Sequence, residues 1–343
     1  MLTALAAELL LLAGSLYMTN VIDQLNQNAI DILQKQVENR QNYLESTMIS
    51  NQDLTLLEDS ITSKAEELLE DGTIQLETLD RSSDNCLPLM EAVSQELLST
   101  LRNNSVTGVL LVINTHDLNQ RSESDTLPCL YIRDLDPASP PSERYSDLQL
   151  LRSPIQMVES LGITTDKVWA PTVRYEALKD DGFFYPVFQA AWVDGGQLSP
   201  SDYGHWTTTP YTLSGDDHPT ISYSVPLILS DGTVYGVVGV EMLVSYLQSI
   251  LPYSELQNNQ SGDYLLAVAH HPLESGNSIQ IQEIACTSGA DAVQQLPSSF
   301  TLTPDRHGGY QISTADTVYH AAAVPLTLYN RNAPFSSEQW LLI

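Results

Sequence analysis

The chain has 343 residues, too many for one compact core, and this length predicts two domains with additional helix. Hydrophobic residues make up 42% of the sequence, which is enough to build folded cores. The 43 Asp and Glu residues against 14 Lys and Arg give a formal net charge of -29. Nucleic acid and anionic membrane surfaces are therefore excluded as favourable partners, because both are bound through Lys and Arg.

The first segment of the chain, from Leu2 to Ile22, is strongly apolar, and Glu8 is its one charged residue. About 20 apolar residues span a bilayer, so residues 1–20 are predicted to form a membrane helix, whole or clipped. A signal peptide is the alternative, but no basic residue precedes the apolar run. The prediction makes the membrane a partner of this segment.

Residues 20–70 contain neither Gly nor Pro and are rich in helix-forming residues. Apolar side chains recur there in steps of three and four, as on one face of a helix: Ile22, Leu25, Ala29 and Ile32. We predict a stalk helix over residues 21–72, with its end at Asp71-Gly72. Such a helix often pairs with a copy of itself, which predicts a homodimer. The alternative is a helix that packs on its own domain, and both arrangements can hold at once.

Strand patterns begin at Gly108 and define a first module over residues 73–251. A helix is expected over Ser153 to Leu161, closed by Gly162. The turn Ser230-Asp231-Gly232-Thr233 predicts a hairpin between its flanking runs. The expected strands are Val109 to Ile113, Cys129 to Asp134, Phe183 to Trp192, Thr220 to Leu229 and Val234 to Leu243.

A second module, residues 252–343, repeats this order in shortened form after a short helix over Ser245 to Leu251. Its expected strands are Tyr264 to Ala269, Ser278 to Ile284, Gly309 to Ser313, Thr317 to Leu328 and Gln339 to Ile343. The fold class is therefore α+β, with a long N-terminal helix and two modules, each a central antiparallel sheet of about five strands with flanking helices. The apolar run Trp340 to Ile343 ends in mid-pattern, so further sequence is expected beyond it.

Motifs for catalysis or metal binding are weak in this sequence. Cys86, Cys129 and Cys286 form no Cys-x-x-Cys pair and no even disulfide framework, and Cys129 is expected to be a buried thiol. There is no Gly-x-Ser-x-Gly and no His-Glu-x-x-His. Asp216-Asp217-His218 and His270-His271 lie in turn-like stretches without a matching ligand pair. We predict no catalytic residue, no metal and no cofactor.

One stretch carries a family signature. Apolar-Ser-x-Ser-x-Pro occurs in Ile221 to Leu227, the Asp-Gly turn follows, and Gly-Val-x-Gly-Val-Glu occurs in Gly236 to Glu241. With the segment Asp202-Tyr203 to Pro210-Tyr211 upstream, the chain resembles the double Cache family of extracytoplasmic sensors. The resemblance covers residues from about 20 to the end. It is specific over 183–250 and only topological over 260–343.

The resemblance implies two PAS-like modules, one membrane-distal and ligand-binding, the other membrane-proximal. It implies a cell-membrane receptor with this segment extracytoplasmic, and a second membrane helix and a signalling output, such as a histidine kinase, chemoreceptor or diguanylate cyclase, beyond residue 343. The expected function is small-molecule sensing with a relay through the stalk helix. The alternatives are an ectodomain that binds no ligand and serves as a structural or protein-docking module, and a secreted hydrolase.

Many double Cache modules bind amino acids through an Arg-x-Trp-Tyr motif, a Tyr and an acid on the next loop, and a final acid after Gly-Val-x-Gly-Val. In this sequence Phe184-Tyr185, Tyr211 and Glu241 match parts of that pattern. Asp181 or Gly182 stands where the Arg is expected, and the loop acid is replaced near Leu213. Without that Arg, an amino acid loses the group that holds its carboxylate.

The candidate ligand-binding residues are aromatic or charged: Trp169, Arg174, Phe184, Tyr185, Trp206, Tyr211, Tyr223 and Glu241. Aromatic faces beside an acid suit an amine or quaternary ammonium, and they also suit a sugar or purine-like ring. An amino-acid-like ligand stays open, with Arg174 as a substitute clamp. Core packing is the alternative for each aromatic residue, and an ordinary surface position is the alternative for Arg174. Glu241, among apolar residues, is expected to need a cationic or hydrogen-bond-donating partner.

Overall fold

The computed structural model describes residues 2–137, 147–252, 262–273, 277–287, 296–314, 317–329, 333–335 and 337–343. The side chains of residues 2–13, 15–17, 19, 20, 180 and 333 are outside this description. The chain forms two compact units. Unit 1 comprises Met1–Glu45, Leu251–Thr327 and Ser337–Ile343, and unit 2 comprises Ser46–Ile250 and Leu328–Ser336.

The N-terminal part of the chain is helical, as predicted, but it forms two helices where one was expected. Helix α1 spans Leu2–Gln52 and α2 spans Thr55–Glu70. The break follows Asn51, a poor helix former whose buried side chain donates to the Ser105 carbonyl at 2.9 Å. The predicted membrane segment, residues 1–20, is the start of α1, and most of its side chains lie outside the described residues. Within the described part of the chain, no helix is both long and apolar enough to cross a membrane.

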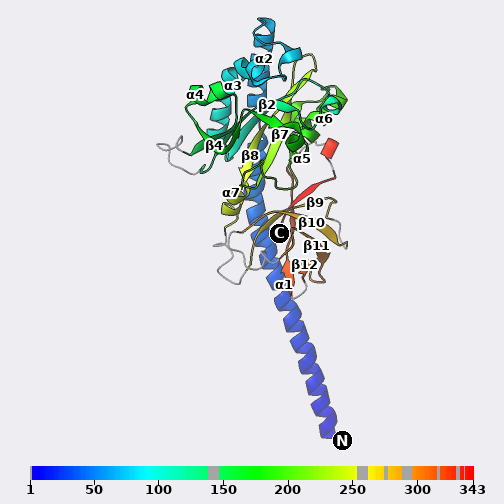
Figure 1. The fold of residues 1–343 in the computed structure, drawn as a ribbon. Helices are drawn as coiled ribbons and strands as arrows, with labels where there is room; N and C mark the ends of the chain where they lie inside the picture. The colour runs from blue at the N-terminus through cyan, green and yellow to red at the C-terminus, as the bar shows by residue number, and fades with distance from the viewer. Residues whose placement is uncertain are drawn as a thin grey trace. The chain divides into compact units, whose positions relative to one another are not determined.

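Unit 2 is built on one sheet with the strand order β4-β3-β2-β1-β8-β7-β6, and β5 pairs with β2 (Figure 1). All its pairs are antiparallel except β3 with β4. The strands are β1 Gly108–Ile113, β2 Thr126–Asp134, β3 Leu148–Arg152, β4 Thr164–Ala170, β5 Thr172–Arg174, β6 His205–Trp206, β7 Thr220–Ile228 and β8 Val234–Leu243. The β7–β8 hairpin and the strands β1 and β2 confirm the sequence prediction.

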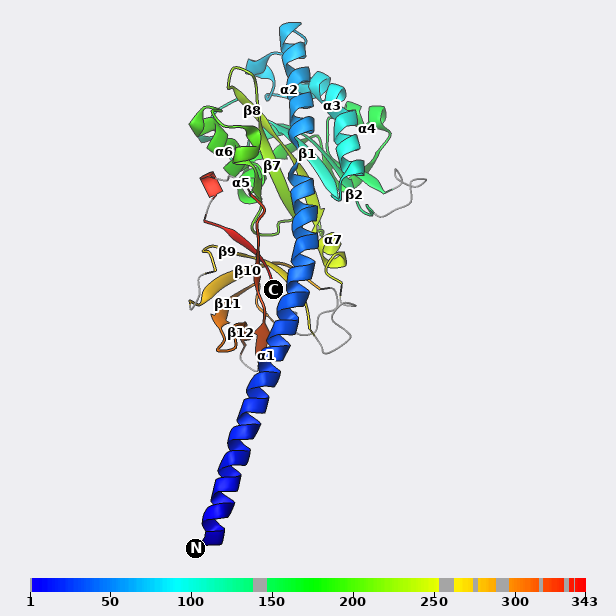
Figure 2. The ribbon, with the colours of Figure 1, turned by 180° about the vertical axis from the view of Figure 1, so that it is seen from behind.

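Helices cover both faces of this sheet (Figure 2). Helix α3, Ser83–Asn103, packs on β1 and β2. On the other face, helices α5 (Tyr175–Asp180) and α6 (Tyr185–Asp194) contribute to a core that includes Leu110 and Val112 of β1. Cys129 lies in that core as a buried free thiol, as predicted, and burial raises its pKa to about 12.

Two short helices in unit 2 were predicted, and a third replaces a predicted strand. Helix α4 spans Ile155–Leu161 and ends at Gly162, whose φ of 64° suits glycine, and α7 spans Val244–Ser249. The predicted strand Phe183 to Trp192 is wrong, because α6 occupies most of this segment. Its buried residues follow helical spacing: Phe184, Val187, Phe188 and Ala191.

Unit 1 holds a second sheet, with the strand order β13-β12-β11-β10-β9-β15-β14 in its described residues. The strands are β9 Leu265–Ala269, β10 Ile279–Cys286, β11 Ser299–Pro304, β12 Tyr310–Ser313, β13 Val318–Ala321, β14 Val324–Leu326 and β15 Gln339–Leu342. Both sheets exceed the expected five strands, because the strands β3 to β6 and β11 were not predicted. The predicted strand Thr317 to Leu328 is wrong as one strand, since it forms β13 and β14 at opposite edges of the sheet. The α+β class with a long N-terminal helix and two sheet modules, the arrangement that the double Cache resemblance implies, is confirmed.

Candidate functional site

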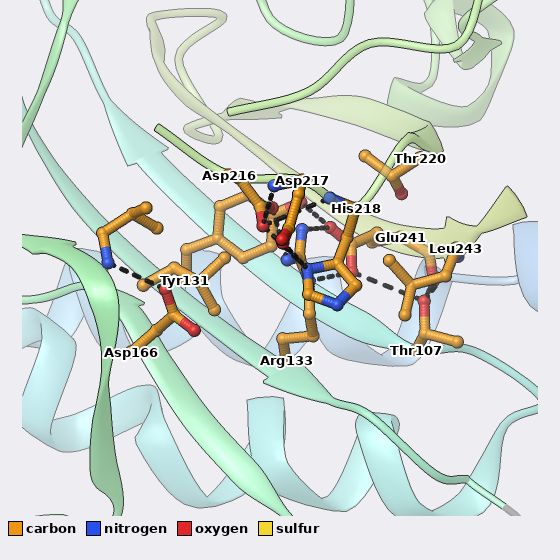
Figure 3. A network of polar contacts seen from close by, with 12 residues as sticks. Thr107, Tyr131, Arg133, Asp166, Asp216, Asp217, His218, Thr220, Glu241 and Leu243 are labelled. Carbon is orange, nitrogen blue, oxygen red and sulfur yellow. Dashed lines mark hydrogen bonds and ion pairs between the residues drawn. The ribbon is translucent and has the colours of Figure 1, made fainter. Parts of the chain in front are cut away.

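A buried ion pair joins two strands of unit 2 across the strand between them. Arg133 on β2 and Glu241 on β8 both stand opposite Gly108 of β1, one on each side, so their side chains share a face of the sheet. The Arg133 Nε donates to Glu241 Oε1 at 2.8 Å, and Nη2 donates to Oε2 at 2.7 Å (Figure 3). A Cβ atom at position 108 would lie 2.8 Å from Glu241 Oε1, so the pair requires glycine there.

Two hydroxyl groups complete the surroundings of the Glu241 carboxylate. The Tyr131 hydroxyl, two residues before Arg133 on the same face, donates to Glu241 Oε2. The Thr107 hydroxyl lies 3.4 Å from Oε1 and accepts from the Leu243 backbone N–H at 2.7 Å. Glu241 and Arg133 are 0% and 1% exposed, so this is a bidentate pair removed from water. The expected cationic partner of Glu241 is therefore present, and it is Arg133.

A surface loop supplies a second carboxylate to Arg133. The loop joins β6 to β7, and its Asp216 Oδ2 accepts from Arg133 Nη1 at 2.6 Å. Asp216 Oδ1 lies 2.8 Å from His218 Nδ1 and accepts from the Asp217 backbone N–H at 2.8 Å. The Asp216 side chain is 0% exposed, whereas those of His218 and Asp217 are 39% and 71% exposed. We call Tyr131, Arg133, Asp216 and Glu241 the Arg133 cluster.

The electrostatics of the Arg133 cluster favour a charged Asp216 and a charged Arg133, with neutral phenols beside them. Burial opposes the charge of Arg133, but the Glu241 carboxylate outweighs it and raises the Arg133 pKa above its ordinary value. Burial also opposes the charge of Asp216, but hydrogen bonds from Arg133 and His218 hold its pKa below the ordinary range. Burial, and then the Glu241 charge, raise the pKa of Tyr131 and Tyr211 well above 10, so both phenols stay protonated.

Strand β7 adds two serine hydroxyls to the same face, with different surroundings. Ser222 stands opposite Glu241, and its Oγ lies 2.7 Å from the Tyr211 hydroxyl. Ser224 follows two residues later, opposite Gly239, and is also 0% exposed. Its Oγ has no hydrogen-bond partner among the described residues. The Ser224 Oγ is therefore a buried polar atom on this face that the described residues leave unsatisfied.

Three of the predicted ligand-binding residues belong to this side of the sheet. Glu241 is in the cluster, and Tyr211 is tied to it through Ser222. Phe184 lies in the same core as Tyr211, 0% exposed and stacked on Phe188 at 5.4 Å between ring centroids. These contacts bring together residues far apart in the sequence.

The other predicted residues lie elsewhere. Trp206 and Tyr223 pair across β6 and β7 on the opposite face, with centroids 5.5 Å apart. Trp169 lies on β4, and its Nε1 donates to Ser153 Oγ at 3.0 Å. Arg174 is exposed at the end of β5 and lies 3.5 Å from Glu176. Tyr185 packs against the core that contains Phe184, and it also lines a surface groove of α6 with Gln189. The structure does not bring these five residues to the Arg133 cluster.

Sequence reasoning missed Tyr131, Arg133 and Asp216. The available signal was the charge of Arg133 inside an otherwise apolar strand, which implies a buried partner. Asp216 was considered only with Asp217 and His218 as a possible metal site. These three side chains do bring ligand atoms within 4.8 Å of one another. Both Asp216 oxygens are already bonded within the protein, so ion pairing accounts for the arrangement.

Comparison with known proteins finds likeness only among solved structures. No family model matches the sequence, and no curated protein matches it. The chain is similar to the sensory domain of the Campylobacter jejuni chemoreceptor Tlp3, with 13% identity, 93% of this chain and 95% of that chain covered, and a TM-score of 0.43. It is similar to the periplasmic sensory domain of Campylobacter jejuni Tlp1, with 12% identity, 92% and 94% coverage, and a TM-score of 0.42. It is also similar to the ligand-binding domain of Campylobacter jejuni Tlp3 in complex with L-valine, with 12% identity, 93% of this chain and 94% of that chain covered, and a TM-score of 0.41.

Proposed function

We propose that the chain is the extracytoplasmic sensing domain of a transmembrane receptor and that unit 2 binds a small molecule at the Arg133 cluster. One observation carries this proposal: a charged network is buried in the core, and a surface loop supplies one of its members. Burying such a network is costly, and apolar residues of similar volume often stabilise a core as well or better. A buried charged network is expected at a binding site where contacts within the protein are replaced by contacts with a ligand.

The loop between β6 and β7 supplies the route of entry. Asp216 is its inward contact, while Asp217 and His218 beside it reach solvent. Moving Asp216 away from Arg133 exposes the cluster, and a ligand that replaces the broken contacts shifts the population toward that arrangement. The loop then changes position with ligand binding, which gives the receptor a signal to relay.

The proposed receptor is a homodimer joined through α1. On this helix Ile22, Leu25 and Ile32 are 50%, 61% and 49% exposed, although they are large and apolar. Together with Met18 and Ala29 they follow the alternating steps of four and three that make a coiled-coil seam. A second copy of the chain supplies an identical seam, and the relay through α1 toward a membrane segment is part of the same proposal.

A thermal-shift screen of the full chain tests ligand binding. A library of amines, amino acids, carboxylates, sugars and nucleobases should contain a compound that raises the melting temperature by roughly 5–10 °C at about 100 times its Kd. Asp216→Asn should abolish that shift. The matched control Asp217→Asn should keep it, because the Asp217 carboxylate is 71% exposed and its pair with Lys167 lies at the surface.

Two results would contradict the proposal. If no compound in the library raises the melting temperature, the chain is better explained as a structural or protein-docking module. If Asp216→Asn retains the full shift, the ligand binds elsewhere in the chain.

A further inference from the structure

We infer that unit 1 contains a second binding site, a cavity between α1 and the sheet, and that this cavity binds an uncharged molecule with one aromatic ring, such as benzyl alcohol. The site is separate from the Arg133 cluster, because the described residues that line the cavity all belong to unit 1. This second ligand goes beyond the proposed function, whose ligand binds in unit 2.

The cavity has a volume of about 120 Å³ and lies between α1 and the strands of unit 1. Its apolar lining comes from distant parts of the sequence: Leu33 and Val37 of α1, Leu265 of β9, Ile312 of β12, Ala321 of β13 and Ile343. All of these side chains except Leu33 are buried. The exposed His320 also lines the cavity, so a ligand can enter from solvent beside β13.

Contacts on both sides of the cavity keep α1 from closing it. On the N-terminal side, Ile30 packs against Gly309, where a Cβ atom would lie 3.0 Å from Ile30 Cδ1, so the helix has no room to move closer. On the C-terminal side, the Gln41 Nε2 donates to the Pro325 carbonyl at 3.0 Å. Water between apolar walls finds few hydrogen-bond partners, and an apolar group that displaces it binds favourably. The fold therefore maintains a recess that suits an apolar molecule better than water.

The size of the cavity and the rings in its lining favour a single aromatic ring. An apolar protein cavity of about 150 Å³ binds one benzene molecule, so the cavity of unit 1 fits one ring with a small substituent. Tyr264 and Tyr319 contribute aromatic side chains to the lining. Pairs of aromatic rings are more stable than their contact area alone explains. The site is therefore expected to prefer an aromatic ring to a saturated ring of the same size.

The charged groups of the lining do not suit a charged ligand. No Lys or Arg is among the described residues that line the cavity, so a carboxylate finds no such cationic partner. The His320 Nδ1 already lies 3.1 Å from Asp305 Oδ2. Asp263, the only acid in the described lining, already has another interaction partner, so an ammonium group has to compete for it. Burying an unpaired charge is costly, which favours an uncharged ligand.

The Gln36 amide offers a polar contact to such a ligand. Gln36 lies on α1, and its half-buried side chain lines the cavity. An amide both donates and accepts hydrogen bonds, so it can pair with a hydroxyl group on the ligand. Leu33, in the same lining, directly follows Ile32 of the exposed seam. A bound ligand therefore contacts α1 one residue from the proposed dimer interface.

Isothermal titration calorimetry on the full chain at pH 7 tests the ligand class with matched probes. Benzyl alcohol is compared with benzylamine and with benzoate, which carry a positive and a negative charge on the same ring. Phenol is compared with cyclohexanol, whose ring is saturated. We expect benzyl alcohol to bind at least tenfold more tightly than either charged probe, which corresponds to about 1.4 kcal/mol. Phenol should bind at least threefold more tightly than cyclohexanol.

Cavity-filling variants test the position of the site. Val37→Phe and Leu33→Phe each place a larger side chain at the cavity, so the affinity for benzyl alcohol should fall at least tenfold, and a cooperative melting transition shows that the variant is folded. The control Lys35→Phe adds the same ring at an exposed position of α1 and should leave the affinity unchanged. Asp216→Asn should also leave it unchanged, because Asp216 belongs to unit 2.

Hydrogen exchange gives the position of the site without any substitution. Benzyl alcohol should slow the exchange of backbone amides in β12 and β13, which line the cavity, and leave those of unit 2 unchanged. This measurement decides the question if neither Phe variant folds.

The outcomes separate the second site from the proposed function. If benzylamine or benzoate binds as tightly as benzyl alcohol, or cyclohexanol as tightly as phenol, the uncharged aromatic class is overturned. If no probe binds, or if both Phe variants fold and keep the wild-type affinity, the site in unit 1 is overturned. If Asp216→Asn abolishes binding of benzyl alcohol, or if exchange slows only in unit 2, the molecule binds in unit 2. The site in unit 1 is then overturned, and small-molecule sensing by unit 2 stands.

Discussion

Glu58 of α2 shows how a single buried carboxyl group makes the stability of unit 2 depend on pH. Its side chain is 7% exposed, and the Thr62 hydroxyl donates to Oε1 at 3.2 Å. Burial raises the pKa of Glu58 to about 7, the Thr62 hydrogen bond lowers it, and the nearby Asp59 raises it further. The folded protein therefore holds a proton that the unfolded chain releases at lower pH.

The sign of the effect follows from that proton. The folded pKa lies above the unfolded value of 4.5, so stability falls as the pH rises from about 4 to about 7 and then levels off. Glu58→Gln removes the titration and keeps a hydrogen-bonding group. At pH 8 it should raise the free energy of unfolding by roughly 1–3 kcal/mol, with a smaller gain at pH 5.

Urea denaturation at both pH values measures this difference, with Glu67→Gln as the control because Glu67 is exposed on the same helix. A Glu58→Gln gain that is equal at pH 5 and pH 8, or a comparable gain from Glu67→Gln, would contradict the account.

At the residue scale, the sequence predicted that Glu241 needs a cationic or hydrogen-bond-donating partner, but it did not identify Arg133 as that partner. An acid among apolar residues needs a cation, and this requirement can be derived locally. Arg133 lies 108 residues earlier, and only the pairing register of β2, β1 and β8 places it opposite the same glycine. The same missing register explains why Trp206 and Tyr223 were grouped with Glu241, although they lie on the opposite face.

At the element scale, helix α6 was mistaken for a strand because aromatic and β-branched residues dominate the segment. The spacing of Phe184, Val187, Phe188 and Ala191 was helical, and Gly195 ends the helix with a φ of 69°. Strands β7 and β8 were predictable because their Asp-Gly turn is a local signal. Short strands such as β6 gave no such signal, because their neighbours in the sheet determine them.

The exposed seam of α1 predicts a specific effect on oligomeric state. Leu25→Glu with Ile32→Glu places like charges at facing positions in the two copies, which opposes pairing. The double variant should sediment as a monomer at concentrations where the wild type is a dimer, as measured by analytical ultracentrifugation. The control, Gln24→Glu with Gln27→Glu, adds the same charge on the side of α1 away from the seam and should leave the dimer intact.

Either of two sedimentation results would argue against this seam. If the wild-type chain is monomeric at all concentrations, the proposed dimer does not form. If the Leu25→Glu, Ile32→Glu variant is still a dimer, the interface lies elsewhere on the chain.

At the scale of the whole molecule, one segment near the C-terminus belongs to unit 2, although the segments before and after it in the sequence belong to unit 1. The segment Leu328–Ser336 belongs to unit 2, where the Tyr329 hydroxyl accepts from the Trp206 backbone N–H at 2.9 Å. The Phe335 ring lies 4.2 Å from that of His205. The sequence placed this segment in the second module, because a returning segment carries no change in composition that marks it.

Hydrogen exchange of the full chain, with and without the compound that gives the largest thermal shift, tests the central claim most directly. Binding at the Arg133 cluster predicts slower exchange of backbone amides in the loop between β6 and β7, residues 207–219, and in β8. Unit 1 also holds a cavity of about 120 Å³, lined by Val37 of α1, Ile312 of β12 and Tyr319 of β13 among others. Slower exchange confined to those elements, with the 207–219 loop unchanged, would contradict the account.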